Sequence, residues 1–230
     1  MVKKDLIIRH PFGLQGEETD IIAAGEFGAV LSRAGVGKTA FLVQLALNAM
    51  LRDKNVLHIS MHDPVDKVTL WYKELFHHLT RRDDKRQGDI LLESLLPHRF
   101  IMTFKVAVFS VPKLKERLSD LAAQDIFHPH MVIIDGLTFD KSIRECLADL
   151  KVLAAKQSLQ VWFSVHTHRH EETRTGEFPP SLESIQDLFD VALNLQPEGT
   201  DGRIQPVKGP ERVVSGLSKL ALDASSMLIK

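Results

Sequence analysis

Short β-rich runs alternate with longer helical patterns along most of the chain, and this alternation constrains the fold more than any other feature of the sequence. Apolar runs of strand length, such as 27–32 and 131–136, are each followed by a segment whose apolar residues keep helical spacing. Strands that are joined by crossover helices favour a parallel sheet with helices on its faces. The sequence therefore predicts an α/β fold with a mainly parallel central sheet and helices on both faces.

The expected elements follow one another along the whole chain. Strands are expected over 27–32, 55–60, 99–104, 131–136 and 160–165, and helices over 38–53, 65–80, 112–124 and 142–157. The charged stretch 80–89 indicates a break. After residue 190 short extended runs separated by turn residues predict antiparallel strands at the C-terminal edge. Because no segment of linker composition divides the chain, we expect a single domain over residues 1–230.

Composition argues against several classes of function. The 230 residues are 44% hydrophobic, which is enough for a packed core. Lys plus Arg number 29 and Asp plus Glu 30, so the net charge of -1 attracts neither nucleic acid nor an anionic membrane. The single Cys146 excludes an intramolecular disulfide and an all-Cys metal site, as in a reducing compartment. The apolar run 6–8 is too short for a signal peptide or a membrane span, so we expect a soluble cytoplasmic protein.

The segment 32–39 has the pattern of a phosphate-binding loop with a serine in place of its first glycine. Gly35 and Gly37 let backbone N–H groups turn inward around a phosphate, and Lys38 supplies a positive charge for the outer phosphates. Thr39 can bind magnesium, and the helix that follows presents its positive end to the anion. A chance turn between a strand and a helix is the alternative. The residues expected to bind a nucleotide are Ser32, Arg33, Ala34, Gly35, Val36, Gly37, Lys38, Thr39 and Ala40.

Four segments together resemble the RecA-like branch of P-loop ATPases, which includes DnaB-type helicases and KaiC-type proteins: 31–46, 58–63, 130–137 and 193–212. The resemblance runs from about residue 27 to the C-terminus and implies a RecA-like P-loop fold that binds ATP and Mg²⁺. In such proteins an aspartate at the end of a central strand supports the magnesium and its water, and Asp135 matches that position. An ordinary aspartate that caps a turn is the alternative interpretation.

The residues that would activate water depart from the family pattern. The family has a glutamate at the end of the strand after the phosphate-loop helix, where this chain has His62 followed by Asp63. A neutral imidazole can polarise water but lacks a permanent charge. The aspartate side chain is one methylene shorter than glutamate, and an error near 1 Å in position costs about a hundredfold in rate. Asp63, His62 and Lys38 are therefore the candidates for a catalytic role. The alternative is that His62 and Asp63 simply form a polar turn before Pro64.

Three alternating histidines follow the strand expected over 160–165. Helicases of the resembling family sense the terminal phosphate near this place with a glutamine, for which His166 or His168 would stand. If the strand continued, His166, His168 and His170 would share one face and could bind a transition metal. Solvated or phosphate-facing histidines are the favoured interpretation, and Arg169 is either a phosphate or subunit contact or an ordinary surface residue.

Lys208 and Arg212 lie in the region where RecA-like ring proteins carry a lysine and an arginine into the nucleotide site of a neighbour. Such cations stabilise charge on the transferring phosphoryl group. The family places them two residues apart, whereas three residues separate them here, so a hairpin tip is the alternative. The resemblance implies a homo-oligomer or a larger protein assembly. Basic residues within 80–89 could face DNA, but acidic residues among them cancel much of the attraction.

These observations predict a weak or partner-dependent ATPase. A nucleotide-binding regulatory or assembly module that does not hydrolyse ATP is the alternative, favoured by the departures at Ser32 and His62. A small-molecule kinase is a third possibility, for which the segment 80–86 is the only candidate lid.

Overall fold

Eight strands form one mixed sheet in the described part of the chain, which covers residues 2–9, 11–12, 20–81, 84–140, 142–167, 178–199 and 201–230. In the computed structural model their order across the sheet is β3-β2-β4-β5-β1-β6-β7-β8. The strands are β1 Phe27–Ser32, β2 Val56–Ser60, β3 Arg99–Thr103, β4 Met131–Asp135, β5 Gln160–His166, β6 Val191–Glu198, β7 Asp201–Lys208 and β8 Ala221–Leu222. Strands β1 to β6 run parallel to one another. Strands β7 and β8 are antiparallel additions, as expected for the C-terminal edge.

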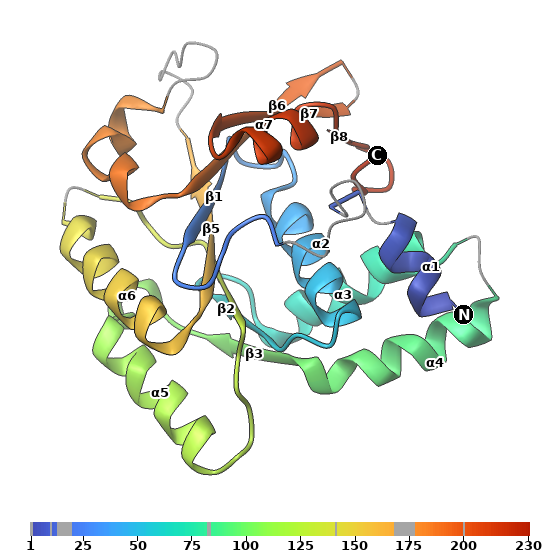
Figure 1. The fold of residues 1–230 in the computed structure, drawn as a ribbon, viewed down its shortest axis with the longest axis horizontal. Coiled ribbons are helices and arrows are strands. Elements are labelled where there is room, and N and C mark those ends of the chain that lie inside the picture. The colour runs from blue at the N-terminus through green and yellow to red at the C-terminus, as the bar shows by residue number, and fades with distance from the viewer. Residues whose placement is uncertain are drawn as a thin grey trace.

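Helices cover both faces of this sheet (Figure 1). The α-helices are α1 Val2–Arg9, α2 Lys38–Leu51, α3 Val65–Leu79, α4 Lys85–Leu95, α5 Val111–Ala123, α6 Ile143–Gln157 and α7 Glu211–Leu217, and the 3₁₀-helices are η2 Leu96–His98, η3 Val106–Val108 and η4 Pro180–Leu188. One apolar core joins the sheet to α2 and α3, and a second joins its other face to α5 and α6. The α/β class with a mostly parallel sheet is therefore confirmed.

The strand β1 shows why the centre of the sheet is parallel and covered. All six of its residues are buried, because helices lie on both faces and leave no solvent-facing side. Gly28 makes room for a neighbour, since a Cβ atom there would lie 2.5 Å from Trp162 Cε3 on β5. In the described part of the chain, none of the helices has the length and apolar character that crossing a membrane requires.

Two segments that the sequence predicts as breaks or turns contain part of a helix or a whole one. Within the charged stretch 80–89, the Asp84 carboxylate accepts a hydrogen bond of 3.0 Å from the backbone N–H of Gln87 and caps α4. An aspartate at this position is a recognisable sign of a helix start, but the many charged residues around it led to the prediction of a break. The second segment contains α7, which follows Pro210. Lys208 and Arg212 therefore flank the turn from β7 into α7 and do not form a hairpin tip.

The buried face of α3 does not include every residue that helical spacing puts beside Leu75. Trp71 and His78 share that side of the helix by spacing, but His78 is exposed and Trp71 is only half-buried. The residues of α3 that are buried are Val68, Tyr72, Leu75 and Phe76. The helix is thus rotated so that Tyr72 faces the sheet.

Tyr72 meets a polar residue of β2 inside the core. His58 is fully buried, and its Nδ1 atom lies 3.1 Å from the Tyr72 hydroxyl. The Arg99 guanidinium lies 4.7 Å from the centre of the Tyr72 ring. Within the described residues, the Nε2 atom of His58 has no hydrogen-bond partner. Burial, the largest cause, lowers the pKa of His58 to about 4, so His58 is neutral in the folded protein at neutral pH.

This buried histidine predicts acid sensitivity. The pKa of His58 is about 4 in the folded chain against an ordinary 6.5, so the unfolded chain binds more protons between these values. The free energy of unfolding should therefore fall by up to about 3 kcal/mol as pH falls from 6.5 to 4. Denaturant titrations at several pH values should show a smaller fall in His58→Leu than in the unmodified chain.

Tyr72→Phe is the matched control, because it removes the same hydrogen bond and keeps the histidine. It should retain the full acid-dependent loss. An equal loss in His58→Leu and Tyr72→Phe would contradict the assignment to His58.

Candidate functional site

The chain turns between Ser32, the end of β1, and Lys38, the start of α2, at the carboxyl edge of the parallel strands. Gly35 and Gly37 have φ angles of 80° and 107°, in the left-handed region that glycine adopts without steric cost. Gly37 precedes α2 without a side-chain cap, and the first turn of α2 holds no acidic residue. The positive end of this helix and its backbone N–H groups therefore suit an anion.

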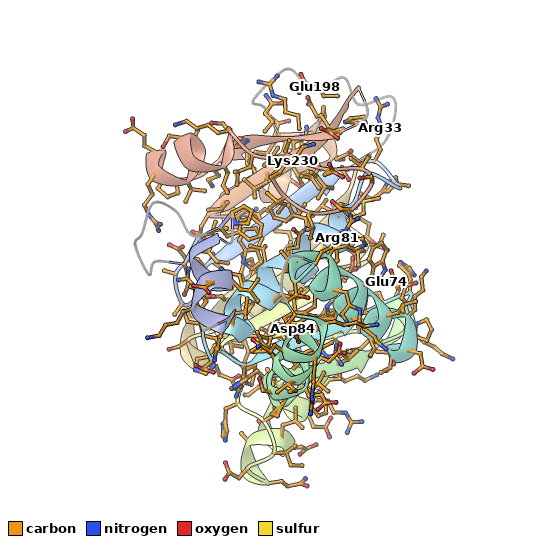
Figure 2. All side chains as sticks on the ribbon, turned by 90° about the vertical axis from the view of Figure 1, so that its right-hand side faces the viewer. Arg33, Glu74, Arg81, Asp84, Glu198 and Lys230 are labelled. Carbon is orange, nitrogen blue, oxygen red and sulfur yellow. The ribbon has the colours of Figure 1, made fainter. Side chains whose placement is uncertain are left out.

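The other residues of the predicted loop are distributed around this turn. Arg33 and Ala34 are exposed, Val36 is half-buried, and Ala40 is buried within α2. Figure 2 shows Arg33 near the upper end of the molecule, in the same region of the view as Glu198 at the end of β6. Arg33 therefore presents a positive charge at the outer surface of the loop.

The Lys38 ammonium is folded into its own loop. Its Nζ atom donates to the Ser32 carbonyl at 2.9 Å, to the Arg33 carbonyl at 2.9 Å and to the Ser32 hydroxyl at 3.1 Å. Burial lowers the pKa of Lys38, and the negative charge of Asp135 opposes this shift. The structure thus gives the loop a cation next to the start of α2, held by oxygen atoms of the same loop.

Thr39 and Asp135 meet although they are 96 residues apart in the sequence. The Thr39 hydroxyl donates to Asp135 Oδ2 at 2.8 Å. The other carboxylate oxygen, Oδ1, accepts from the Ser164 hydroxyl on β5, and that hydroxyl accepts from the Gly136 N–H at 2.8 Å. Ser164 is not among the residues predicted for the site, and its only signal in the sequence is a polar side chain within the apolar run 161–165.

This pair has the donor chemistry of a magnesium site. Carboxylate and hydroxyl oxygens are hard ligands, and Mg²⁺ keeps several waters, so one or two protein donors suffice. Thr39 and Asp135 therefore fit Mg²⁺ when a phosphate supplies further oxygens. Among the described residues, no group of three or more His, Cys, Asp or Glu side chains is arranged to hold a metal ion without such a partner.

His62 and Asp63 follow β2 and have different surroundings. His62 is exposed and lies over Gly136, because a Cβ atom on Gly136 would be 2.5 Å from His62 Cδ2. Asp63 Oδ1 accepts from Lys67 Nζ at 2.9 Å in the first turn of α3. The structure therefore brings His62 to the residue next to Asp135, whereas an ion pair holds the carboxylate of Asp63.

His166 ends β5 beside the start of the loop. It pairs with Ser32 in the parallel register of β1 and β5, and the Thr167 N–H donates to the Ser32 carbonyl at 3.0 Å. Strand alternation puts His166 on the same face of the sheet as Ser164. His168, Arg169 and His170 lie outside the described residues, so the histidine metal site stays a prediction.

Lys208 and Arg212 lie at the opposite edge of the sheet from the loop. Lys208 pairs with Ala192 near the start of β6, and its Nζ atom donates to the Gln186 carbonyl at 2.9 Å. Arg212 donates to the carbonyl of Asp20 at 3.2 and 3.3 Å. Neither cation reaches the loop of its own chain, and their role in a neighbour's site stays a prediction.

The bonds around Asp135 predict unequal costs for two substitutions. Ser164→Ala removes the hydroxyl that accepts a hydrogen bond from the Gly136 N–H. Because Ser164 is only 4% exposed, water cannot replace the hydroxyl, and the free energy of unfolding should fall by about 1–3 kcal/mol. Thr39→Val should cost less, because Thr39 is only half-buried and water can replace its hydroxyl. Chemical denaturation measures both values, and a larger loss in Thr39→Val would refute this ranking.

Comparison with known proteins assigns no family to this geometry. No protein-family model matches the chain, and no curated protein matches it at a significant level.

Proposed function

We propose that this chain is a RecA-like P-loop protein that binds ATP with magnesium. The observation that carries the proposal is the 2.8 Å hydrogen bond between Thr39 Oγ1 and Asp135 Oδ2, beside the uncapped start of α2. A phosphate at that helix start would lie within reach of Lys38, and its magnesium would lie next to two hard oxygen donors. Thr39 and Asp135, which are 96 residues apart in the sequence, would thus bind the same magnesium ion.

The position of the site in the sheet supports the same proposal. In open α/β sheets, ligands bind outside the carboxyl ends of the strands. Ser32, Asp135 and His166 end the parallel strands β1, β4 and β5, and β5 lies between the other two. In the proposed complex, backbone N–H groups around Gly35 and Gly37 cradle phosphate, Lys38 binds the outer phosphates, and Thr39 and Asp135 hold Mg²⁺.

We further propose that ATP hydrolysis is weak or depends on a partner. His62 is the better candidate to position water, because its imidazole lies over Gly136, the residue that follows Asp135. Asp63 would first have to leave its ion pair with Lys67. The same ion pair favours the alternative function, a nucleotide-binding regulatory or assembly module without turnover, since it leaves the strand end without a free carboxylate.

A small-molecule kinase receives less support from the arrangement. The segment proposed as its lid begins after α3, whose 15 residues carry the chain about 22 Å from the end of β2. Figure 2 shows Arg81 well below Arg33, over the region of α3 and α4. Arg81 therefore lies away from the loop that a lid would have to close.

The proposed setting is an assembly in the cytoplasm. Lys208 and Arg212 can act only on a nucleotide that a neighbouring subunit holds, because their own loop lies at the other edge of the sheet. A homo-oligomer or a larger protein assembly is therefore the partner we propose. Nucleic acid has no support from the net charge of -1.

Lys38 provides the test of ATP binding. ATP with Mg²⁺ at about 100 times its Kd should stabilise the unmodified chain by about 2.7 kcal/mol, and Lys38→Ala should lose this stabilisation. Thermal unfolding with and without ATP measures the difference. The control is Lys115→Ala on the exposed surface of α5, which should keep the full shift. An unchanged shift in Lys38→Ala would remove the site assignment.

His62 and Asp63 provide the test of hydrolysis. His62→Ala should lower phosphate release by about a hundredfold while ATP binding persists, because a general base contributes at least that much. Asp63→Asn should have the smaller effect, since its carboxylate is paired with Lys67. Phosphate release and bound nucleotide are measured in the same samples. Tight binding without turnover in the unmodified chain, even at high protein concentration, would instead establish the regulatory module.

A further inference from the structure

Ser32 stands where the phosphate-loop pattern has its first glycine, and its side chain contacts the loop lysine. The residue is 1% exposed at the end of β1. Its hydroxyl donates its single proton to the Arg33 carbonyl at 2.8 Å. The lone pairs of the Ser32 oxygen are therefore left for the Lys38 ammonium, which lies 3.1 Å away.

A count of donors shows what this contact does. A lysine ammonium has three N–H donors, and the carbonyls of Ser32 and Arg33 and the Ser32 hydroxyl accept all three. Lys38 must release one of these oxygens before it can donate to a phosphate. The two carbonyls belong to the backbone and remain with any residue at these positions. The hydroxyl is the one acceptor that depends on serine.

We infer that the Ser32 hydroxyl is a latch, which holds Lys38 inside the empty loop and weakens binding of the outer phosphates. This inference rests on the proposed function and adds a regulating residue to the same site. When a nucleotide binds, Lys38 exchanges the Ser32 hydroxyl for a phosphate oxygen, so part of the binding free energy is used to open the latch. A glycine or alanine at position 32 makes no such bond.

The latch predicts a gain of affinity from a loss of contact. A hydrogen bond to a charged group contributes enough that Ser32→Ala should tighten ATP binding about tenfold. Tripolyphosphate should gain by the same factor, because it presents phosphates to Lys38 without a base or sugar. Isothermal titration calorimetry with Mg²⁺ measures both dissociation constants. A role of Ser32 in folding alone would lower stability without tightening either ligand.

Three further variants make the test specific. Ser32→Gly restores the usual pattern and should also gain affinity, which keeps the test valid if Ser32→Ala is poorly folded. Ser32→Thr keeps a hydroxyl and should not show the gain. Ser119→Ala, the same substitution on the exposed face of α5, should leave both dissociation constants unchanged.

The outcomes separate this inference from the proposed function. If the unmodified chain binds ATP and both Ser32→Ala and Ser32→Gly bind it equally or more weakly, the latch is refuted and the nucleotide site stands. If the unmodified chain, Ser32→Ala and Ser32→Gly all fail to bind ATP and tripolyphosphate, the proposed function fails and the latch fails with it.

Discussion

Three elements of the molecule are tied together by Asp135. Its carboxylate accepts from Thr39 on α2 and Ser164 on β5, and its backbone carbonyl accepts from the Met61 N–H after β2 at 2.9 Å. A half-buried carboxylate is stable only when such donors replace water. One side chain therefore links the start of the loop helix to the central strands, and it is also the residue that we propose as a magnesium ligand.

A second aspartate, Asp20, links several elements in the same way at the amino edge of the sheet. The Asp20 carboxylate accepts from Lys54 before β2 and from Gln160 at the start of β5, at 2.5 and 2.6 Å. Its backbone carbonyl accepts from Arg212 on α7. The amino edge is thus held by a cluster of bonds whose cations are already partnered. The carboxyl edge, in contrast, brings the start of α2 and Lys38 close to Asp135 and Thr39. Groups of these kinds can bind a phosphate and a magnesium ion.

The charges near the site are partly withdrawn from solvent. Lys38 lies within its loop, where burial lowers its pKa, and the Asp135 carboxylate is half-buried. Water screens such groups less than it screens surface ions, so each interaction with a bound anion would be stronger. Thr39 and Asp135, the proposed magnesium ligands, are already in contact, whereas the lysine must exchange partners. Binding at this site would therefore need no rearrangement of Thr39 and Asp135, but Lys38 would have to release an oxygen atom of its own loop.

The sequence by itself determined the order of most strands and helices and the position of the predicted phosphate loop, because hydrophobic periodicity and glycine spacing are local properties. Local charge hid α4, although its Asp84 cap is readable. Only the tertiary structure decided that Thr39 meets Asp135, that Ser164 supports it and that Lys67 holds Asp63. The tertiary structure also placed Lys208 and Arg212 at the amino ends of the parallel strands, on the side away from the loop. These contacts depend on strand order and direction across the sheet, which no local pattern of residues specifies.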